Sequence, residues 1–352
     1  MTMTITELDA RGGGHERVAL CSDPEVGYRG IIAVHSTALG PALGGTRFWD
    51  YASDEEALVD ALRLARGMTY KNALAGIPFG GGKSVIIGDN RTRERERVFR
   101  AHGRFVEIFA GSYITAEDVG TTPADMELCR AETRHAAGLA GGSGDPSPFT
   151  ARGVLRAMQA AAKFRWGADS LAGRTVALQG LGHVGLYLAR ALRESGARLV
   201  VADVDAGRAR RAADELGARP VAPDEIYGVA ADVFAPCALG GVLNDETLPQ
   251  LKVEIVCGAA NNQLLEARHG DALHARGILY APDYAANAGG VINGCRELLG
   301  WTPERSGERV RALYDTLLHI FTLARDAGVP THAAADRLAE ARLRDAAAAR
   351  AR

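Results

Sequence analysis

The sequence lacks the charge bias, the long apolar runs and the leader that mark several protein classes. Its formal net charge is −2 over 352 residues, so charge gives no case for a nucleic acid or an anionic membrane as partner. No apolar run approaches the ~20 residues of a membrane span. The N-terminus, MTMTITELDARGGGHERVAL, lacks the basic start and apolar core of a signal peptide. We therefore expect a soluble, cytoplasmic protein with a small-molecule partner.

Cysteine is scarce and scattered, and no internal repeat or low-complexity segment stands out. The five cysteines are Cys21, Cys129, Cys237, Cys257 and Cys295. Their odd number and the absence of any CxxC argue against a disulfide framework and against a zinc site. We expect reduced thiols and no metal centre.

The length predicts two domains, because 352 residues exceed what one hydrophobic core usually serves. A cleft between two domains would be a natural ligand site. Glycine, serine and proline cluster in GLAGGSGDPSP, residues 138–148, too densely for a regular element. We place the boundary there, which gives domains 1–144 and 145–330. A helix from about 330 either packs back on the first domain or frays.

The element order predicts an α/β fold in both domains. Strands are expected at 31–35 and 85–87, and a helix at 54–68 with Ser53 as its N-cap and Glu56 three residues later. Beyond the boundary, helices are expected at 150–164, from about His183 and at 206–216, alternating with the strands TVALQG, ARLVVADVD, ADVFAP, EIVCGAA and ILYAPD. This alternation is typical of a parallel Rossmann-type sheet. Residues 304–352 are mostly helical, with a break near 328–330.

A glycine fingerprint lies between a predicted strand and a predicted helix. Gly180, Gly182 and Gly185 fit GxGxxG, and a second strand ends on Asp203. The glycines permit a tight turn and let backbone N–H groups approach a pyrophosphate, while the acid can bind ribose hydroxyls. The alternative is a tight turn without a ligand.

The carboxylate of Asp203 favours NAD over NADP, because it would repel a 2′-phosphate. Arg208 and Arg210 follow closely and weaken that preference slightly.

Two lysines lie in an apolar, glycine-rich stretch, RGMTYKNALAGIPFGGGKSVIIGD. Lys71 and Lys83 are poor candidates for solvated surface charges, since lysine is rarely enclosed without a partner or a function. The GGKS string resembles the end of a phosphate-binding loop, but that motif needs glycine where Ile77 stands, and Gly76 misses by one. We therefore expect Lys83 at the end of a glycine turn, partly desolvated, with a lowered pKa.

A carboxylate follows in YITAEDVGTT. Asp118 comes at the end of a predicted strand, where it could serve a ligand, merely cap the helix that starts after Thr122, or pair with a nearby arginine. Two lysines and one carboxylate suit an amino-acid substrate: one cation binds its carboxylate, one amine transfers protons, and the acid faces its nitrogen.

Seven strings resemble the amino-acid dehydrogenase family that includes the leucine, valine and phenylalanine enzymes, with glutamate dehydrogenase more distant. They are STALGPALGGTRFW, RGMTYKNALAG, GGGKSVIIGD, YITAEDVGTT, FAPCALGG, GAANNQL and YAPDYAANAGGVIN. The match runs in order from about residue 15 to 345. The resemblance implies NAD-dependent, reversible oxidative deamination of an L-amino acid to a 2-oxo acid and ammonia. It also implies a homo-oligomer assembled through a substrate-binding first domain.

The resemblance also implies roles for individual residues. Lys83 would be the general base and Asp118 would manage protons at the nitrogen. The substrate carboxylate would be held by Lys71, Asn262 and the backbone at Gly44 and Gly45. The cofactor would contact Thr150 at the nicotinamide carboxamide, and otherwise Gly180, Gly182, His183, Val184, Gly185, Asp203, Cys237, Ala238 and Asn261.

The positions that match the family's side-chain pocket are Leu43, Ala116, Val291 and Gly294. None is charged, so a glutamate side chain would have no partner. Leucine, valine and isoleucine are the expected substrates. Gly294 departs from the bulkier residue expected there and leaves room for an aromatic ring, so phenylalanine is the alternative. A catalytically inactive NAD-binding protein is a distant second class.

Overall fold

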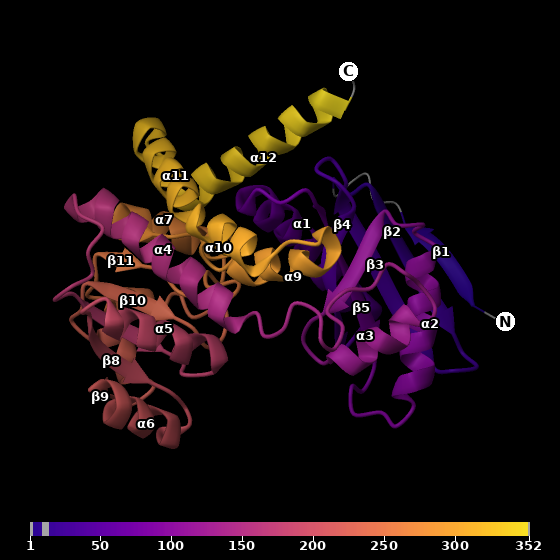
Figure 1. Ribbon diagram of the computed structural model, residues 1–352, viewed down its shortest axis with the longest axis horizontal. Coiled ribbons are helices and arrows are strands. Elements are labelled where there is room, and N and C mark those ends of the chain that lie inside the picture. The colour runs from indigo at the N-terminus through magenta and orange to yellow at the C-terminus, as the bar shows by residue number, and fades with distance from the viewer. Residues whose placement is uncertain (1–2, 9–13, 351–352) are drawn as a thin grey trace. The chain divides into compact units, whose positions relative to one another are not determined.

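The computed structural model describes residues 3–8 and 14–350, which form two compact units (Figure 1). The first unit comprises Met1–Gly144, Gly294–Trp301 and Ala339–Arg352 as far as these are described. The second comprises Asp145–Asn293 and Thr302–Leu338. Among the described residues, no helix is both long enough and apolar enough to cross a bilayer.

A mixed six-stranded sheet forms the centre of the first unit, in the order β1-β2-β3-β5-β4-β6. Its strands are β1 (Thr4–Leu8), β2 (Arg17–Asp23), β3 (Tyr28–Ser36), β4 (Ala42–Trp49), β5 (Gly80–Ile87) and β6 (Tyr113–Glu117). Strands β1, β2, β3 and β5 pair antiparallel, whereas β4 pairs in parallel with both β5 and β6. The strands predicted at 31–35 and 85–87 are the centres of β3 and β5.

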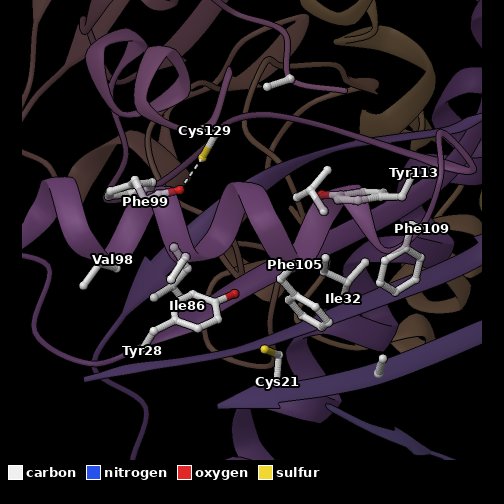
Figure 2. Close-up of a cluster of buried hydrophobic side chains, with 14 of the residues drawn as sticks. Cys21, Tyr28, Ile32, Ile86, Val98, Phe99, Phe105, Phe109, Tyr113 and Cys129 are labelled. Carbon is white, nitrogen blue, oxygen red and sulfur yellow. Dashed lines mark hydrogen bonds between the residues drawn. The ribbon is translucent and has the colours of Figure 1, made fainter. Parts of the chain in front are cut away.

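Helices cover both faces of this sheet. α1 (Asp54–Ala75) packs its alanines against Ile31 and Val85 on one face. The opposite face carries α2 (Arg95–Glu107) and a larger aromatic cluster (Figure 2). α3 (Pro123–Arg130) follows on that side, where the Cys129 thiol donates to the Phe99 carbonyl at 3.3 Å. The two clusters hold β5 between them, and β5 carries Lys83.

Helix α1 starts as predicted but runs seven residues further. The Ser53 hydroxyl accepts the Glu56 N–H at 3.1 Å, which is an N-cap. The helix ends at Gly76, whose φ of +65° suits glycine and closes the last turn. The extra turns bury Thr69 and Leu74, so tertiary packing stabilises the helix beyond Gly67. Lys71 is therefore a helical residue.

The glycine turn expected before Lys83 is wrong, since Gly80, Gly81 and Gly82 are strand residues of β5. A Cβ on Gly81 would lie 2.0 Å from the Thr69 backbone nitrogen, and one on Gly82 would lie 2.7 Å from the Tyr113 ring. The glycines are needed because α1 and an aromatic ring press closely on the two faces of the strand.

The second unit is a Rossmann-type fold, as predicted. Its six-stranded sheet is parallel throughout, in the order β12-β11-β10-β7-β8-β9, which is the order of dinucleotide-binding domains. The strands are β7 (Thr175–Gln179), β8 (Arg198–Ala202), β9 (Arg219–Pro220), β10 (Val233–Pro236), β11 (Ile255–Val256) and β12 (Leu279–Tyr280). The helices among them are α4 (Ser147–Trp166), α5 (His183–Glu194), α6 (Ala206–Leu216) and α7 (Ala267–Ala275).

The remaining helices are α8 (Asp283–Ala286), α9 (Gly289–Leu299), α10 (Pro303–Arg311), α11 (Leu313–Ala327) and α12 (Thr331–Arg350). The break predicted near 328–330 is confirmed, because Gly328 caps α11 with a φ of +62°. The last part of α12 belongs to the first unit, where Arg342 donates to the Ala73 and Leu74 carbonyls of α1. Residues 351–352 of the predicted C-terminal segment lie outside the described residues.

Candidate active site

Lys83 and Asp118 form an ion pair on the face of the first sheet that α1 covers. The Lys83 ammonium lies 2.7 Å from Oδ2 of Asp118. Lys83 is only 4% exposed, and it follows the glycine segment of β5. Asp118 comes directly after β6. The capping role considered for Asp118 is wrong, since Thr122 caps α3 in a capping box with Asp125.

A second cation reaches the same carboxylate oxygen. Arg47, on β4, donates from Nε to Oδ2 of Asp118 at 3.1 Å. Its Nη1 donates to Asp60 of α1 at 2.9 Å, and the Tyr51 hydroxyl donates to the same Asp60 oxygen at 2.7 Å. The arginine partner considered for Asp118 is thus confirmed as Arg47, whereas the chain of contacts that continues to Asp60 and Tyr51 was not predicted. The alternation of β4 is the signal that could have found it, since Arg47 shares a face with Leu43 and Gly45.

Burial and the neighbouring charges shift the pKa values of Lys83 and Asp118 in opposing directions. Burial lowers the pKa of Lys83 below its usual range; Asp118 opposes this, and Arg47 lowers the pKa further. Burial acts to raise the pKa of Asp118, but Lys83 and Arg47 outweigh it and lower the pKa to about 2. The site therefore combines an ionised carboxylate with an amine whose pKa lies below its usual range.

Close backbone packing places Lys71 near the same strand. A Cβ on Gly81 would collide with Thr69 of α1, so helix and strand touch there. Lys71 and Lys83 each lie two residues beyond that contact. The Asn72 amide fixes the helix by donating to the Gly80 carbonyl at 2.6 Å.

Glycines 44 and 45 allow β4 to approach its neighbours. A Cβ on Gly44 would lie 1.7 Å from the Gly82 carbonyl oxygen, and one on Gly45 would lie 2.4 Å from that of Glu117. No other residue fits at either position. The two predicted carboxylate-binding glycines are thus required by the packing of the strands that hold Lys83 and Asp118.

A buried polar network lies under the pair, on the face that α2 covers. Thr46 Oγ1 is 2.7 Å from Ser84 Oγ, 2.9 Å from His102 Nε2 and 2.5 Å from Thr115 Oγ1. The other His102 nitrogen is 2.7 Å from the Tyr28 hydroxyl. Burial lowers the pKa of His102 to about 3. His102 is therefore a neutral core histidine, and the network ties together the strands that carry the site.

The predicted side-chain pocket is distributed over three elements. Leu43 is buried on β4, and Ala116 is half-buried on β6, where it pairs with Gly45, two residues beyond Leu43. Gly294 lies one turn beyond Val291 on α9, on the same face of that helix. A Cβ on Gly294 would meet no described atom within 4 Å. Position 294 therefore has room for a larger side chain.

The glycine fingerprint in the second unit fits a dinucleotide. Gly180 has a φ of +94° and lies so close to Ala238 that a Cβ would be 2.8 Å from its backbone nitrogen. A Cβ on Gly185 would lie 2.0 Å from the Gly180 carbonyl oxygen. Gly182, by contrast, faces open space among the described atoms, at the start of an α5 that no side chain caps. The free helix N-terminus and the open position suit a pyrophosphate.

Two further predicted cofactor residues lie in the first turn of α5, where His183 is exposed and Val184 is half-buried.

Asp203 lies beside this turn. Its two carboxylate oxygens accept the N–H groups of Leu181 at 2.6 Å and Asp205 at 2.8 Å. Each oxygen keeps a second lone pair for a ribose hydroxyl. Arg208 is 3.9 Å from Asp203 and 3.5 Å from Asp205, so acids surround the guanidinium that could have bound a 2′-phosphate.

The other predicted cofactor residues also lie in the second unit. Burial raises the pKa of the Cys237 thiol to about 12, which argues against a nucleophile and for packing beside the turn. The Thr150 hydroxyl lies close to Gly290, since a Cβ on Gly290 would be 2.7 Å from that hydroxyl. Asn261 accepts the Asn287 amide at 2.7 Å. Asn262, predicted to hold the substrate carboxylate, also lies in this unit and adopts a φ of +52°, a conformation that asparagine tolerates and that often marks functional loops.

The lysine count is a further sequence signal for the site. Only four of the 41 basic residues are lysines: Lys71, Lys83, Lys163 and Lys252. Arginine stays protonated at any working pH, whereas a buried lysine can lose its proton. In a chain that uses arginine at most of its basic positions, two lysines within twelve positions favour a requirement for the amine itself.

Family models match most of the chain. A model described as Glu/Leu/Phe/Val dehydrogenase, dimerisation domain, matches residues 15–135. A second, described as glutamate/leucine/phenylalanine/valine dehydrogenase, matches residues 141–208 and 204–350.

Individual relatives match over nearly their whole length. A leucine dehydrogenase from Geobacillus stearothermophilus is 55% identical over 94% of this chain and 90% of that protein. A phenylalanine dehydrogenase from Caldalkalibacillus thermarum is 50% identical over 94% and 91%. The crystal structure of an L-tryptophan dehydrogenase from Nostoc punctiforme has a TM-score of 0.87 at 45% identity, over 96% of this chain and 98% of that one.

Proposed function

Because the chain belongs to the glutamate/leucine/phenylalanine/valine dehydrogenase family, we propose that it catalyses the reversible oxidative deamination of a branched-chain L-amino acid to its 2-oxo acid and ammonia. The observation that carries this proposal is the ion pair of Lys83 and Asp118, buried beside the strand glycines. An apolar set of pocket positions accompanies the pair. The proposed location is cytoplasmic, where the five free thiols would stay reduced.

Each residue of the first unit has a proposed task. Lys71 binds the substrate carboxylate, with help from Asn262 and the backbone of Gly44 and Gly45. Asp118 is ionised, since its pKa is about 2, so it accepts a hydrogen bond from the substrate nitrogen rather than donating a proton. Neutral Lys83 removes a proton from the water that attacks the iminium carbon. The protonated lysine can return that proton when ammonia leaves.

We propose NAD as the cofactor, held at Gly180, Gly182, Gly185 and Asp203, with Thr150 at the carboxamide. When bound, this group accepts the hydride from the substrate Cα. The acids around Arg208 support NAD over NADP, because they weaken the attraction of that arginine for a 2′-phosphate.

The proposed assembly is a homo-oligomer formed through the first unit. The matched model for residues 15–135 is described as a dimerisation domain, and this supports self-association.

A panel of L-amino acids, assayed by the absorbance of the reduced cofactor, tests the proposal. We expect the highest kcat/KM with leucine, valine or isoleucine, and overlapping values among them, because one methylene in an apolar pocket changes binding by only ~1–3 kcal/mol. NAD should support a higher kcat/KM than NADP. Absence of turnover with every amino acid, despite tight NAD binding, would instead indicate an inactive dinucleotide-binding protein.

Phenylalanine is the second candidate, because position 294 is open. We expect Gly294→Val to leave leucine turnover largely intact and to lower kcat/KM for phenylalanine about tenfold more than for leucine, since the new side chain occupies space that an aromatic ring would need. The matched control is Gly67→Val, at a helical glycine that also meets no described atom within 4 Å. Equal losses for both substrates would show that position 294 does not select the side chain.

A further inference from the structure

We propose that Arg47 is a positioning residue for this reaction, which it serves by holding Asp118 and by competing with Lys83 for the same carboxylate oxygen. The inference rests on the proposed function, because it assigns Arg47 to the same site. It comes from the geometry of one carboxylate oxygen that two cations share.

The shared oxygen is Oδ2 of Asp118. Lys83 Nζ lies 2.7 Å from it and Arg47 Nε lies 3.1 Å from it. A carboxylate oxygen that accepts two charged donors is less available to each of them. Arg47 therefore competes with Lys83 for the one anion that would otherwise hold the lysine proton.

The far end of Arg47 is fixed independently. Its Nη1 donates to Asp60 of α1, and the Tyr51 hydroxyl donates to the same oxygen. Arg47 is about three-quarters buried, with a side chain 24% exposed. The guanidinium thus bridges two carboxylates, and its planar set of donors suits this bridging.

The charged and titratable groups around the pair come from every element packed there. Arg47 lies on β4, Lys83 on β5, and Glu117 and Asp118 at the end of β6. From α1 comes Asp60, which Arg47 contacts. Glu56 and Arg63 of α1 and Tyr51 before it line the same pocket as Arg47 and Asp60. Tyr113 of β6 lies behind the sheet, and burial raises its pKa, with Asp118 contributing.

These groups act on Lys83 in opposite directions. Arg47 disfavours the protonated amine, whereas Asp118 and Asp60 favour it. Removal of the arginine should therefore raise the pKa of Lys83, and removal of the Asp60 charge should lower it. A purely structural role for the chain would not produce opposite signs.

The test is the pH profile of kcat/KM for leucine with NAD, measured for the wild type, Arg47→Met and Asp60→Asn. We expect the acid limb of Arg47→Met to move up by about one pH unit and that of Asp60→Asn to move down by about half a unit. At one pH unit below the wild-type acid limb, the kcat/KM of Arg47→Met should be about tenfold below that of the wild type. This difference should disappear as the pH rises. The ionisation of leucine itself is the same for each variant, so the differences report the enzyme.

Two features keep the outcome interpretable. Both variants leave each carboxylate a partner, since Asp118 keeps Lys83 and Asp60 keeps Tyr51, and thermal melting checks their folding. Arg47→Lys keeps the charge and should restore the limb toward the wild-type pH. Acid limbs that do not move, or that move the same way in Arg47→Met and Asp60→Asn, would overturn the proposal.

The inference and the proposed function fail in different ways. If the wild type turns over no amino acid, the proposed function is wrong. If the wild type is active and the variants keep its pH profile, only the role of Arg47 is wrong.

Discussion

Lys83→Ala is expected to lower kcat by about 1,000-fold while leaving the Kd for NAD unchanged. The amine is the proposed base, and a positioned general base contributes about 10²–10⁴-fold. The glycine fingerprint belongs to the other unit, so cofactor binding should not respond. Steady-state kinetics with leucine and a fluorescence titration with NADH measure the two quantities.

The variant should still fold, because Asp118 keeps the guanidinium of Arg47 at 3.1 Å and is not left as an unpaired charge. Lys83→Arg is the sharper variant: it restores the cation but cannot lose its proton at the working pH. We expect it to be as inactive as Lys83→Ala. The matched control is Lys163→Ala, at an exposed lysine that donates to the Gly167 carbonyl. A Lys83→Ala enzyme within tenfold of the wild-type kcat would rule out the proton-transfer role.

Lys71→Ala is expected to raise the KM for leucine about 100-fold with a much smaller change in kcat. A charge-assisted hydrogen bond to a carboxylate contributes ~1.5–3 kcal/mol, and here it acts on substrate and transition state alike. The loss should appear equally in the KM for the 2-oxo acid in the reverse direction, because that product carries the same carboxylate.

Leucinamide supplies an independent check on what Lys71 contacts. The wild type should strongly prefer leucine to its amide, and Lys71→Ala should lose most of that preference, because the amide lacks the charge that the lysine binds. Lys252→Ala, at an exposed lysine of the second unit, serves as the control. Retention of the full preference in Lys71→Ala would place the carboxylate elsewhere.

Local sequence signals predicted the second unit well. The strand, glycine turn, helix and acid of the fingerprint are all close neighbours in the chain, so their periodicity and turn chemistry specify the fold without distant contacts. Helix α6 has the predicted bounds, 206–216. The fingerprint residues consequently lie together, and Cys237 and Ala238 approach them from a distant segment.

The first unit was harder to predict because its geometry depends on distant partners. The glycines before Lys83 suggested a turn, since nothing local shows that Thr69 and Tyr113 press on the two faces of β5. The end of α1 was missed for a similar reason: buried residues beyond Gly67 stabilise the last turns.

By itself the sequence determined the fold class, the dinucleotide fingerprint, the family resemblance and the choice of Lys71, Lys83 and Asp118. Those depend on residue type and short spacing. Only the tertiary structure decided that Arg47 and Lys83 share one oxygen of Asp118. That contact joins β4, β5 and the end of β6, and the pKa of a buried group depends on which charges the fold brings within a few ångströms of it.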